Sequence, residues 1–215
     1  MQSLEDELER ARALDVGELA DAVETIGFEC TRCGACCRSE ADDPHTATVF
    51  PDEVRRLEGE GYDWRDVARP MPFGLDDDGT GETFEWALQV DDCGDCTFYE
   101  EADDGTGACT VHEERPLICR TYPFSVAVGG TSQPMGEAVD AEGVVRAHEC
   151  EGLGRDISRA DAEELAAALK ERAVRELEEA IEVRDNYEPT DVDGVVVHDS
   201  EGQKRPDGTP LVDQE

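Results

Sequence analysis

The chain has 215 residues, of which 55 are acidic and 19 are basic, giving a formal net charge of −36. Such an acidic chain repels nucleic-acid phosphates and anionic lipid surfaces, so we expect no nucleic acid and no membrane among its partners. The apolar content is ordinary for a globular protein, whereas nine cysteines are an unusually large number.

The acidity is spread along the whole chain, and only Lys170 and Lys204 are lysines. This pattern is typical of halophilic proteins, because at molar salt the Debye length falls to roughly 3 Å and carboxylates no longer repel one another. The alternative is an acidic protein from an ordinary cell. The halophilic interpretation predicts loss of structure at low ionic strength.

No apolar run approaches the length that a membrane span requires, and the acidic, amphipathic N-terminus is unlike a secretory signal. We therefore expect a cytoplasmic protein. Thiols stay reduced in that compartment, so a dense set of cysteines indicates a metal site more than a disulfide scaffold.

Hydrophobic periodicity predicts a helix over 4–14, begun by Ser3 with Asp6, and a second over 16–26, ended by Gly27. Further along the chain, short helices are predicted over 51–59 and 63–68. Short strands are predicted over 46–50, 84–90, 126–128 and 144–145.

A long helix is predicted near residues 159–184, where one apolar stripe recurs at helical spacing. The expected fold is a small, irregular, metal-organised α+β domain with several helices and few short strands. We divide the chain into an N-terminal helical segment, a cysteine-cluster domain, a packing helix and a loosely held tail, which cover residues 1–27, 28–154, 155–186 and 187–215.

A run of closely spaced cysteines reads Cys30-Thr-Arg-Cys33-Gly-Ala-Cys36-Cys37. Two residues between thiolates allow a tight turn to present both sulfurs to one cation, and Gly34 permits the backbone to reverse direction. Cys36 and Cys37 are neighbours, so we expect their side chains to diverge and to serve two metals, or different irons of one cluster.

Downstream cysteines supply enough thiolates for one four-ligand site with spares, or for two sites; they are Cys93, Cys96, Cys109, Cys119 and Cys150. A site of four thiolates is anionic and requires nearby cations. Four arginines lie within four residues of a cysteine, and we expect them to surround the bound group: Arg32, Arg38, Arg115 and Arg120. Pro116 is expected to open a short helical turn that presents Cys119.

The spacing leaves the metal open. A bacterial ferredoxin pattern begins correctly at Cys30, Cys33 and Cys36 but requires a cysteine where Glu40 stands. Pairs of the form C-x-x-C suit tetrahedral Zn²⁺, and sets of soft thiolates serve iron–sulfur clusters equally well.

The four histidines fall into two groups. His112 and His148 lie close to cysteines and are expected to be neutral, hydrogen-bonded neighbours of the site, with direct ligation as the alternative. His45 and His198 lie in polar segments and are expected to be solvated. The aromatic residues Trp64, Trp86, Phe84 and Phe98 are expected in the core.

At its cysteines the chain resembles the YkgJ-like cysteine-cluster proteins, also called the CxxCxxCC zinc- or iron-chelating family. The first run matches, and so do three later segments: Cys96-Thr-Phe-Tyr, then Cys109-Thr-Val-His-Glu-Glu-Arg115-Pro116-Leu-Ile-Cys119-Arg120-Thr-Tyr-Pro123-Phe124, and Cys150-Glu-Gly152-Leu-Gly154. The resemblance spans about residues 28–154. It implies eight metal-ligating positions, with Cys93 as an extra: Cys30, Cys33, Cys36, Cys37, Cys96, Cys109, Cys119 and Cys150.

Three functions are compatible with this resemblance. The first is a metal-binding protein that holds an iron–sulfur cluster or Zn²⁺. The second is a cluster-dependent modifying enzyme, because flagellin lysine N-methylases carry a similar cysteine cluster and are associated with an iron–sulfur cluster, which favours [4Fe–4S]. The third and weakest is thiol redox chemistry, which requires an exposed thiolate of low pKa. No nucleotide-binding motif is visible, so the methylase activity is not carried over.

Overall fold

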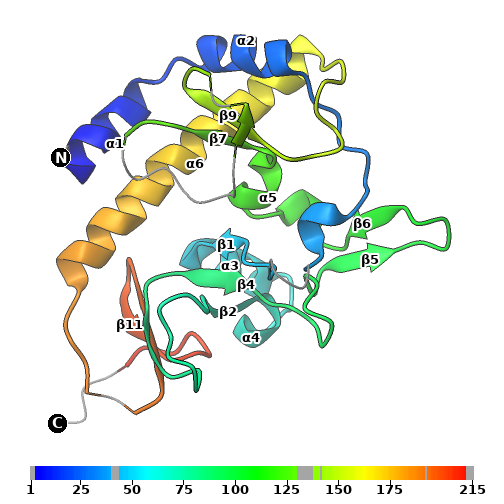
Figure 1. Cartoon of the computed structure of the whole chain (residues 1–215). Helices are drawn as coiled ribbons and strands as arrows, with labels where there is room; N and C mark the ends of the chain where they lie inside the picture. Colours follow the sequence, from blue (N-terminus) through cyan, green and yellow to red (C-terminus); the bar gives the residue numbers. More distant parts are fainter. Residues whose placement is uncertain (1–2, 40–43, 130–137, 141, 192, 212–215) are drawn as a thin grey trace. The chain divides into compact units, whose positions relative to one another are not determined.

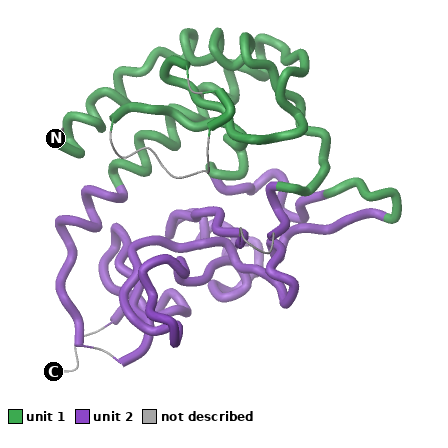
Figure 2. The backbone as a smooth tube through the Cα atoms, viewed as in Figure 1, with its two compact units in different colours: residues 1–35, 103–107, 117–178 green, residues 36–102, 108–116, 179–215 purple. Residues whose placement is uncertain are grey.

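The computed structural model describes residues 3–39, 44–129, 138–140, 142–191 and 193–211. Short strands in small sheets accompany the helices, which confirms the predicted α+β class (Figure 1). The chain forms two compact units that interleave along the sequence (Figure 2). Unit 1 comprises residues 1–35, 103–107 and 117–178, and unit 2 comprises residues 36–102, 108–116 and 179–215.

Unit 1 begins with two helices, α1 (Leu4–Ala13) and α2 (Val16–Ile26). Ser3 caps α1 as predicted, because its hydroxyl accepts from the Asp6 N–H while the Asp6 carboxylate accepts from the Ser3 N–H. Gly27 ends α2 with a φ of 77°, a conformation that favours glycine.

The rest of unit 1 is a small sheet with flanking helices. Strands β7 (Phe124–Val126), β9 (Val145–His148) and β8 (Ala138–Asp140) form an antiparallel sheet in the order β7-β9-β8. The short helix α5 (Leu117–Thr121) leads into β7, and Pro116 precedes it as predicted. Fully buried Phe124 contacts the ring of Phe28 edge-on, which ties the segment after α2 to this sheet.

Helix α6 (Arg159–Asn186) matches the predicted long helix. Its apolar stripe is buried at Ala162, Ala166 and Leu169 and again further along at Ala173 and Leu177. At its start the Arg159 guanidinium pairs with acidic groups of α2, Asp21 and Glu24. The helix is part of unit 1 up to residue 178 and of unit 2 beyond it.

Unit 2 contains a three-stranded antiparallel sheet in the order β1-β4-β2, formed by Thr48–Val49, Trp86–Leu88 and Ala68–Pro70. Two helices pack in the same unit, α3 (Pro51–Gly59), which begins at proline as predicted, and α4 (Trp64–Val67). Trp64, Trp86 and Phe98 are buried, as expected, whereas Phe84 is 46 % exposed and the expectation of a core position for it is wrong.

The expectation of a loosely held C-terminal tail is also wrong. Strand β10 (Val195–Asp199) pairs in parallel with β3 (Gly81–Thr83) and antiparallel with β11 (Gly202–Lys204). Val196, Val197 and His198 are buried there. The sequence does not reveal how this segment is attached, because a parallel pairing with a strand more than 100 residues earlier leaves no local signal.

The β10–β11 hairpin carries a buried charged network. Lys204 Nζ lies 2.7 Å from a carboxylate oxygen of Asp199 and 2.6 Å from one of Glu201. The indole Nε1 of Trp86 donates to Asp199 at 2.8 Å. Each buried charge in the network therefore has partners, as burial of charge requires.

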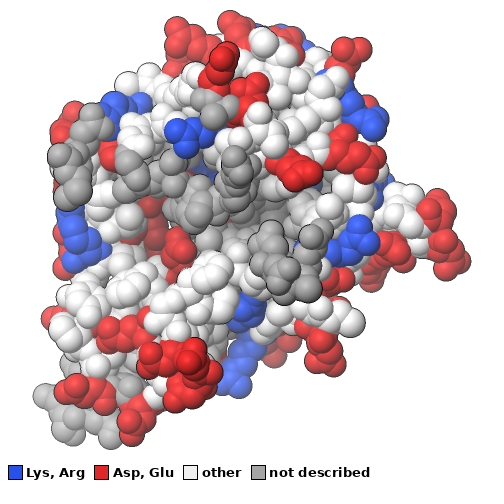
Figure 3. All heavy atoms as spheres, in the orientation of Figure 1, with Lys and Arg blue, Asp and Glu red and all other residues white. Residues whose placement is uncertain are grey.

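A further two-stranded sheet consists of β5 (Tyr99–Glu101) and β6 (Gly107–Cys109). Two 3₁₀ turns, Ala35–Cys37 and His112–Glu114, are the remaining regular elements of the described chain. Acidic side chains are scattered over the face drawn in Figure 3, with few basic ones among them. None of the helices in the described ranges has the length and apolar character needed to cross a membrane.

Candidate metal centre

The first cysteine run is a series of tight turns. Arg32 and Gly34 both have positive φ values, 57° and 75°, so the backbone reverses between Cys33 and the 3₁₀ turn Ala35–Cys37. The sulfur atoms of Cys36 and Cys37 lie 3.9 Å apart. The expectation that these neighbouring side chains diverge is wrong, because the turn brings both sulfurs to the same side.

This sulfur separation suits a shared metal ion. A tetrahedral ion with metal–sulfur bonds of about 2.3 Å holds its thiolates about 3.8 Å apart. The pKa of Cys36 is raised well above its ordinary value, first because its thiol is hydrogen-bonded with Cys37 and second because of burial. Metal binding at this pair would have to displace the proton of Cys36, because the thiolate is the metal ligand.

Cys96 lies beside this pair in unit 2. Its N–H donates to the Cys37 carbonyl at 2.8 Å, and its side chain is 6 % exposed. Burial raises the pKa of Cys96 to about 11, and the negative charges of Cys109 and Cys36 add to this rise. Burial is also the first cause of the raised pKa of Cys109, with Cys36 contributing. Cys36, Cys96 and Cys109 thus interact electrostatically, and Cys37 interacts with Cys36.

In unit 1, backbone pairing joins the segment just before Cys30 to the segment just after Cys150. Phe28 forms an antiparallel bridge with Leu153, and the Glu29 N–H donates to the Gly152 carbonyl at 3.0 Å. Beyond this pairing the chain turns, since the Leu153 N–H donates to the Cys150 carbonyl at 3.2 Å. The Cys150 sulfur in turn accepts the Gly152 N–H at 3.4 Å.

Cys119 reaches the same region from α5. The hydroxyl of Tyr122, just after the helix, donates to the Glu149 carbonyl at 2.5 Å. The His148 N–H donates to the Pro123 carbonyl at 2.9 Å. The end of α5 is therefore held against the segment that immediately precedes Cys150.

Arg115 is the predicted arginine that the structure brings to the thiols of unit 2. Its positive charge partly opposes the rise in the pKa of Cys36 and of Cys109, and its Nε donates to the His112 carbonyl at 2.9 Å. Arg38 lies 3.6 Å from Glu101 in an exposed ion pair, and Arg32 and Arg120 are exposed. A role of these three beside a bound group stays a prediction.

Two of the four histidines are placed differently from expectation. His45 is 7 % exposed and His198 is 2 % exposed, so neither is solvated as expected. His148 is buried, and its Nε2 lies 2.8 Å from the Ser125 hydroxyl, as expected of a hydrogen-bonded neighbour. His112 has an exposed side chain near Glu113.

His45 is the residue beside the thiols that the sequence reasoning missed. Burial lowers its pKa, and the Cys36 backbone is among its interaction partners. Its Nδ1 is buried with no hydrogen-bond partner within the described ranges. It lies eight positions after Cys37, a spacing typical of no common metal-site pattern, so no sequence signal indicates this position.

Cys93, the extra cysteine, is exposed on the turn before Cys96. Its N–H donates to the Asp91 carboxylate at 2.8 Å, and the Ser39 hydroxyl donates to its carbonyl at 3.3 Å. None of the nine cysteines, all of which the structure describes, forms a disulfide.

The thiols do not form a finished metal-binding cage in the described part of the chain. Within the described ranges, no three Cys, His, Asp or Glu side chains stand in a metal-binding arrangement. A thiol moves by rotation of one side-chain torsion, so the backbone placement and the 3.9 Å sulfur pair decide whether a metal fits. By that test the donor set fits a thiolate-bound metal.

This combination of an α+β fold and unbridged, turn-held cysteines defines a thiolate-rich metal-binding protein. A family model named CxxCxxCC, with the description "Putative zinc- or iron-chelating domain", matches residues 29–151. The match covers more than half of the chain, and the chain belongs to this family. No curated protein and no solved structure matches the chain.

Proposed function

We propose that this protein binds metal through the thiolates of its eight family cysteines, as an iron–sulfur cluster or as Zn²⁺. The observation that carries the proposal is the Cys36–Cys37 sulfur pair, whose 3.9 Å separation suits a common metal, with the Cys96 and Cys109 thiols beside it. Thiolate sets of this kind serve both zinc and iron–sulfur centres.

Two arguments bear on the choice of metal. The 3.9 Å separation supports two thiolates on one metal atom, since a zinc ion binds its sulfurs about 3.8 Å apart. The resemblance of the cysteine cluster to that of flagellin lysine N-methylases supports [4Fe–4S]. When bound, either group supplies the folding free energy that links the turns; an iron–sulfur cluster also supplies electron transfer.

Anaerobic purification of the full chain tests the proposal. A brown protein with about four iron atoms and acid-labile sulfide would show a cluster, and a colourless protein with bound zinc would show a zinc centre. We expect Cys96→Ser to lower the metal content, while Cys93→Ser, which alters the extra cysteine on the same turn, leaves it unchanged. A reduced wild-type chain that holds neither metal overturns the proposal.

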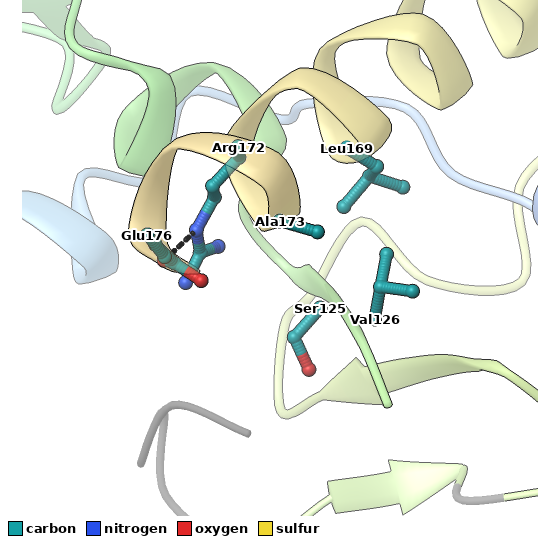
Figure 4. Close-up of a pocket in the computed structure, with 6 residues that line it drawn as sticks. All are labelled: Ser125, Val126, Leu169, Arg172, Ala173 and Glu176. Atoms are coloured by element: carbon teal, nitrogen blue, oxygen red, sulfur yellow. Dashed lines mark hydrogen bonds and ion pairs between the residues drawn. The ribbon is translucent and has the colours of Figure 1, made fainter. Parts of the chain in front are cut away.

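The enzyme alternative has less support. It requires a substrate pocket with a perturbed acid or base beside the cluster. A hollow in unit 1, lined by residues of β7 and α6, has room for about one water molecule (Figure 4). Its Arg172 donates to Glu176 at 2.6 Å and to the Thr121 hydroxyl at 3.0 Å, so these groups serve the packing of α6. Transfer of a labelled methyl group from S-adenosylmethionine to a protein lysine would favour the enzyme.

We also propose that the protein works in a salt-rich cytoplasm. The match to a metal-chelating domain supports a compartment that keeps thiols reduced, and the net charge of −36 supports high salt. Fractionation of native cells under reducing conditions, followed by immunodetection, tests the compartment.

A further inference from the structure

Three aromatic rings meet beside strands β3 and β10 of unit 2. Phe84 directly follows β3, His198 lies in β10, and Tyr187 directly follows α6. The Phe84 and His198 rings are stacked with centroids 5.3 Å apart, and the Tyr187 centroid lies 5.0 Å from His198 and 5.7 Å from Phe84. Each ring therefore contacts the other two, and we call this group the three-ring cluster.

Two rings of the cluster are open to solvent. His198 is 2 % exposed, whereas Phe84 is 46 % exposed and Tyr187 is 41 % exposed. Two of the four large hydrophobic side chains that are exposed in the described part of the chain thus meet at this one place. Exposed aromatic rings in contact with each other are typical of interaction surfaces, where tyrosine and phenylalanine are enriched.

A carboxylate borders these rings. Glu82 Oε2 accepts from the Tyr187 hydroxyl at 3.2 Å, while Oε1 accepts from the Thr190 N–H at 3.2 Å and lies 3.6 Å from His198 Nε2. A carboxylate has about four acceptor sites, so about two remain for further donors. The Glu82 side chain is 28 % exposed, and no Lys or Arg of the described ranges forms an ion pair with it. Glu82 is therefore an accessible acceptor that lacks a permanent cation.

The surroundings of the cluster favour a cationic partner. Glu85 follows Phe84 and Glu188 follows Tyr187 in the chain, and both are exposed. The chain as a whole carries a net charge of −36, which repels anionic partners. The face of an aromatic ring is also negative and attracts a cation placed within about 6 Å of its centroid.

Ring faces beside a carboxylate fit a guanidinium group better than an ammonium group. Guanidinium is planar and weakly hydrated, so it stacks on a ring while its N–H groups bond a carboxylate, whereas ammonium is a strongly hydrated point charge. Small-molecule sites are concave and enclose most of the ligand, but here both outer rings are exposed. The surface therefore suits a side chain that a larger molecule presents.

We propose that the three-ring cluster and Glu82 form a docking site for an arginine side chain on the surface of a partner protein. The guanidinium would stack on the exposed rings of Phe84 and Tyr187 and donate to the Glu82 carboxylate. High salt screens long-range attraction but leaves contacts of this kind, because stacking and desolvated hydrogen bonds act at short range. The proposal is independent of the metal that the cysteines bind.

NMR titration of the reduced full chain in multimolar KCl tests the proposal. The probes are two Gly–Ser peptides that carry arginines or lysines at the same positions. We expect the arginine peptide to shift the ring protons of Tyr187 and His198 and to bind about threefold or more tighter than the lysine peptide. Equal affinities of the two peptides, or shifts that leave these rings unaffected, overturn the proposal.

Matched variants separate the ring contact from general attraction to an acidic protein. Phe84→Leu should weaken the arginine peptide about threefold or more, whereas Phe73→Leu, which alters a phenylalanine that is 64 % exposed in the same unit, should leave its affinity unchanged. Glu82→Gln should also weaken binding, and Glu58→Gln, which removes the same charge from an exposed position on α3, should not. Equal effects within either pair overturn the proposal.

Two further readouts complete the test. Trp emission reports whether each variant is folded, and if Phe84→Leu unfolds, the Glu82→Gln variant decides, because glutamine has nearly the same shape and keeps an acceptor for Tyr187. Sedimentation of the wild-type chain tests the other occupant of such a surface, a second copy of this chain. Self-association that Phe84→Leu abolishes would overturn the assignment to an arginine-bearing partner.

Discussion

The β10–β11 hairpin and the thiol set of unit 2, which comprises Cys36, Cys37, Cys96 and Cys109, belong to the same unit, yet they satisfy their polar groups in opposite ways. In the hairpin, Lys204 is paired with Asp199 and Glu201, and Trp86 donates to Asp199. In the thiol set, sulfurs lie beside other sulfurs, with Arg115 as a nearby cation. The hairpin contains its own counter-charges, whereas the thiolates require an added cation. We therefore expect metal to organise the second region and not the first.

Metal removal should give the largest effect. The cysteine-bearing turns should lose the folding free energy that metal binding supplies to them, on the order of 10 kcal/mol for a structural zinc site, and should open locally. Reactivity of the thiols with an alkylating reagent should rise at once. Trp emission should stay native-like, because Lys204 Nζ lies 5.2 Å from the Trp64 ring centroid and Trp86 bonds to Asp199. A red shift of the emission on chelation would contradict the comparison.

A change of salt concentration should give the next largest effect, and it should act on the exposed carboxylates more than on the buried hairpin network. The chain carries a net charge of −36, and dilute buffer leaves its exposed carboxylates unscreened. We expect the Tm to rise strongly between dilute buffer and multimolar KCl. The buried Lys204–Asp199 pair is screened much less than exposed pairs, so the Trp emission of the folded protein should not change with KCl. A Tm that stays constant across this range would refute the halophilic interpretation.

Lys204→Met should destabilise the hairpin by about 3–5 kcal/mol, because it leaves the Asp199 carboxylate buried without its cation. Arg65→Met is the matched control. Arg65 forms an ion pair with Asp207 in the same unit, but its side chain is 68 % exposed, so its loss should cost less than about 1 kcal/mol. Urea unfolding followed by Trp emission measures both, and equal costs would show that the network is not effectively buried.

A pair of glycines with the same φ of +76° tests how tightly the hairpin region is packed. A Cβ at Gly208 would stand 2.2 Å from the Trp64 ring, whereas a Cβ at Gly79 would meet nothing within 4 Å. Both alanine variants incur about 1–2 kcal/mol for the left-handed conformation. Gly208→Ala should cost about 1–3 kcal/mol more because of overpacking. If urea unfolding gave equal costs for the two, the Trp64 contact would be loose.

The smallest expected effect is a pH dependence at Glu201. Arg55 is the first cause and Lys204 a further cause of its low pKa, which falls from 4.5 to about 2. The stabilisation is present above pH 4.5 and is lost as the pH falls toward 2. Because the side chain is 38 % exposed, screening limits the effect to less than about 1 kcal/mol. Relative to wild type, Glu201→Gln should be less stable at pH 6 and equal at pH 2; a constant difference would contradict this assignment.

Elements with local signals could be predicted from the sequence. The Ser3 cap, the Gly27 end of α2 and the Pro51 start of α3 each depend on groups within a few residues, and all three are present. The parallel pairing of β10 with β3 could not be predicted, because Val195 and Gly81 are far apart in the chain and neither strand is marked by a turn that joins them.

The candidate site, too, could be predicted only where its features depend on residues close together in the sequence. Spacing was sufficient to select the thiols, since C-x-x-C pairs and the family pattern depend only on local order. Spacing was misleading for Cys36 and Cys37, because the direction of adjacent side chains depends on the 3₁₀ turn. The spacing of the cysteines gave no indication of His45. Its buried position beside Cys36 involves groups distant in sequence, among them Arg69, which donates to the His45 carbonyl.

The amino-acid sequence alone determined the identity of the sulfur donors, the acidic character, the family and the principal helices, because these depend on composition and on neighbours within one or two turns. Tertiary structure alone decided which sulfurs share a unit and which charges are buried together. Phe28 approaches Leu153, and Trp86 approaches Asp199, only after segments more than 100 residues apart have come together. Hydrogen bonds and ion pairs act over a few ångströms of space, so their partners are set by the folded path of the chain.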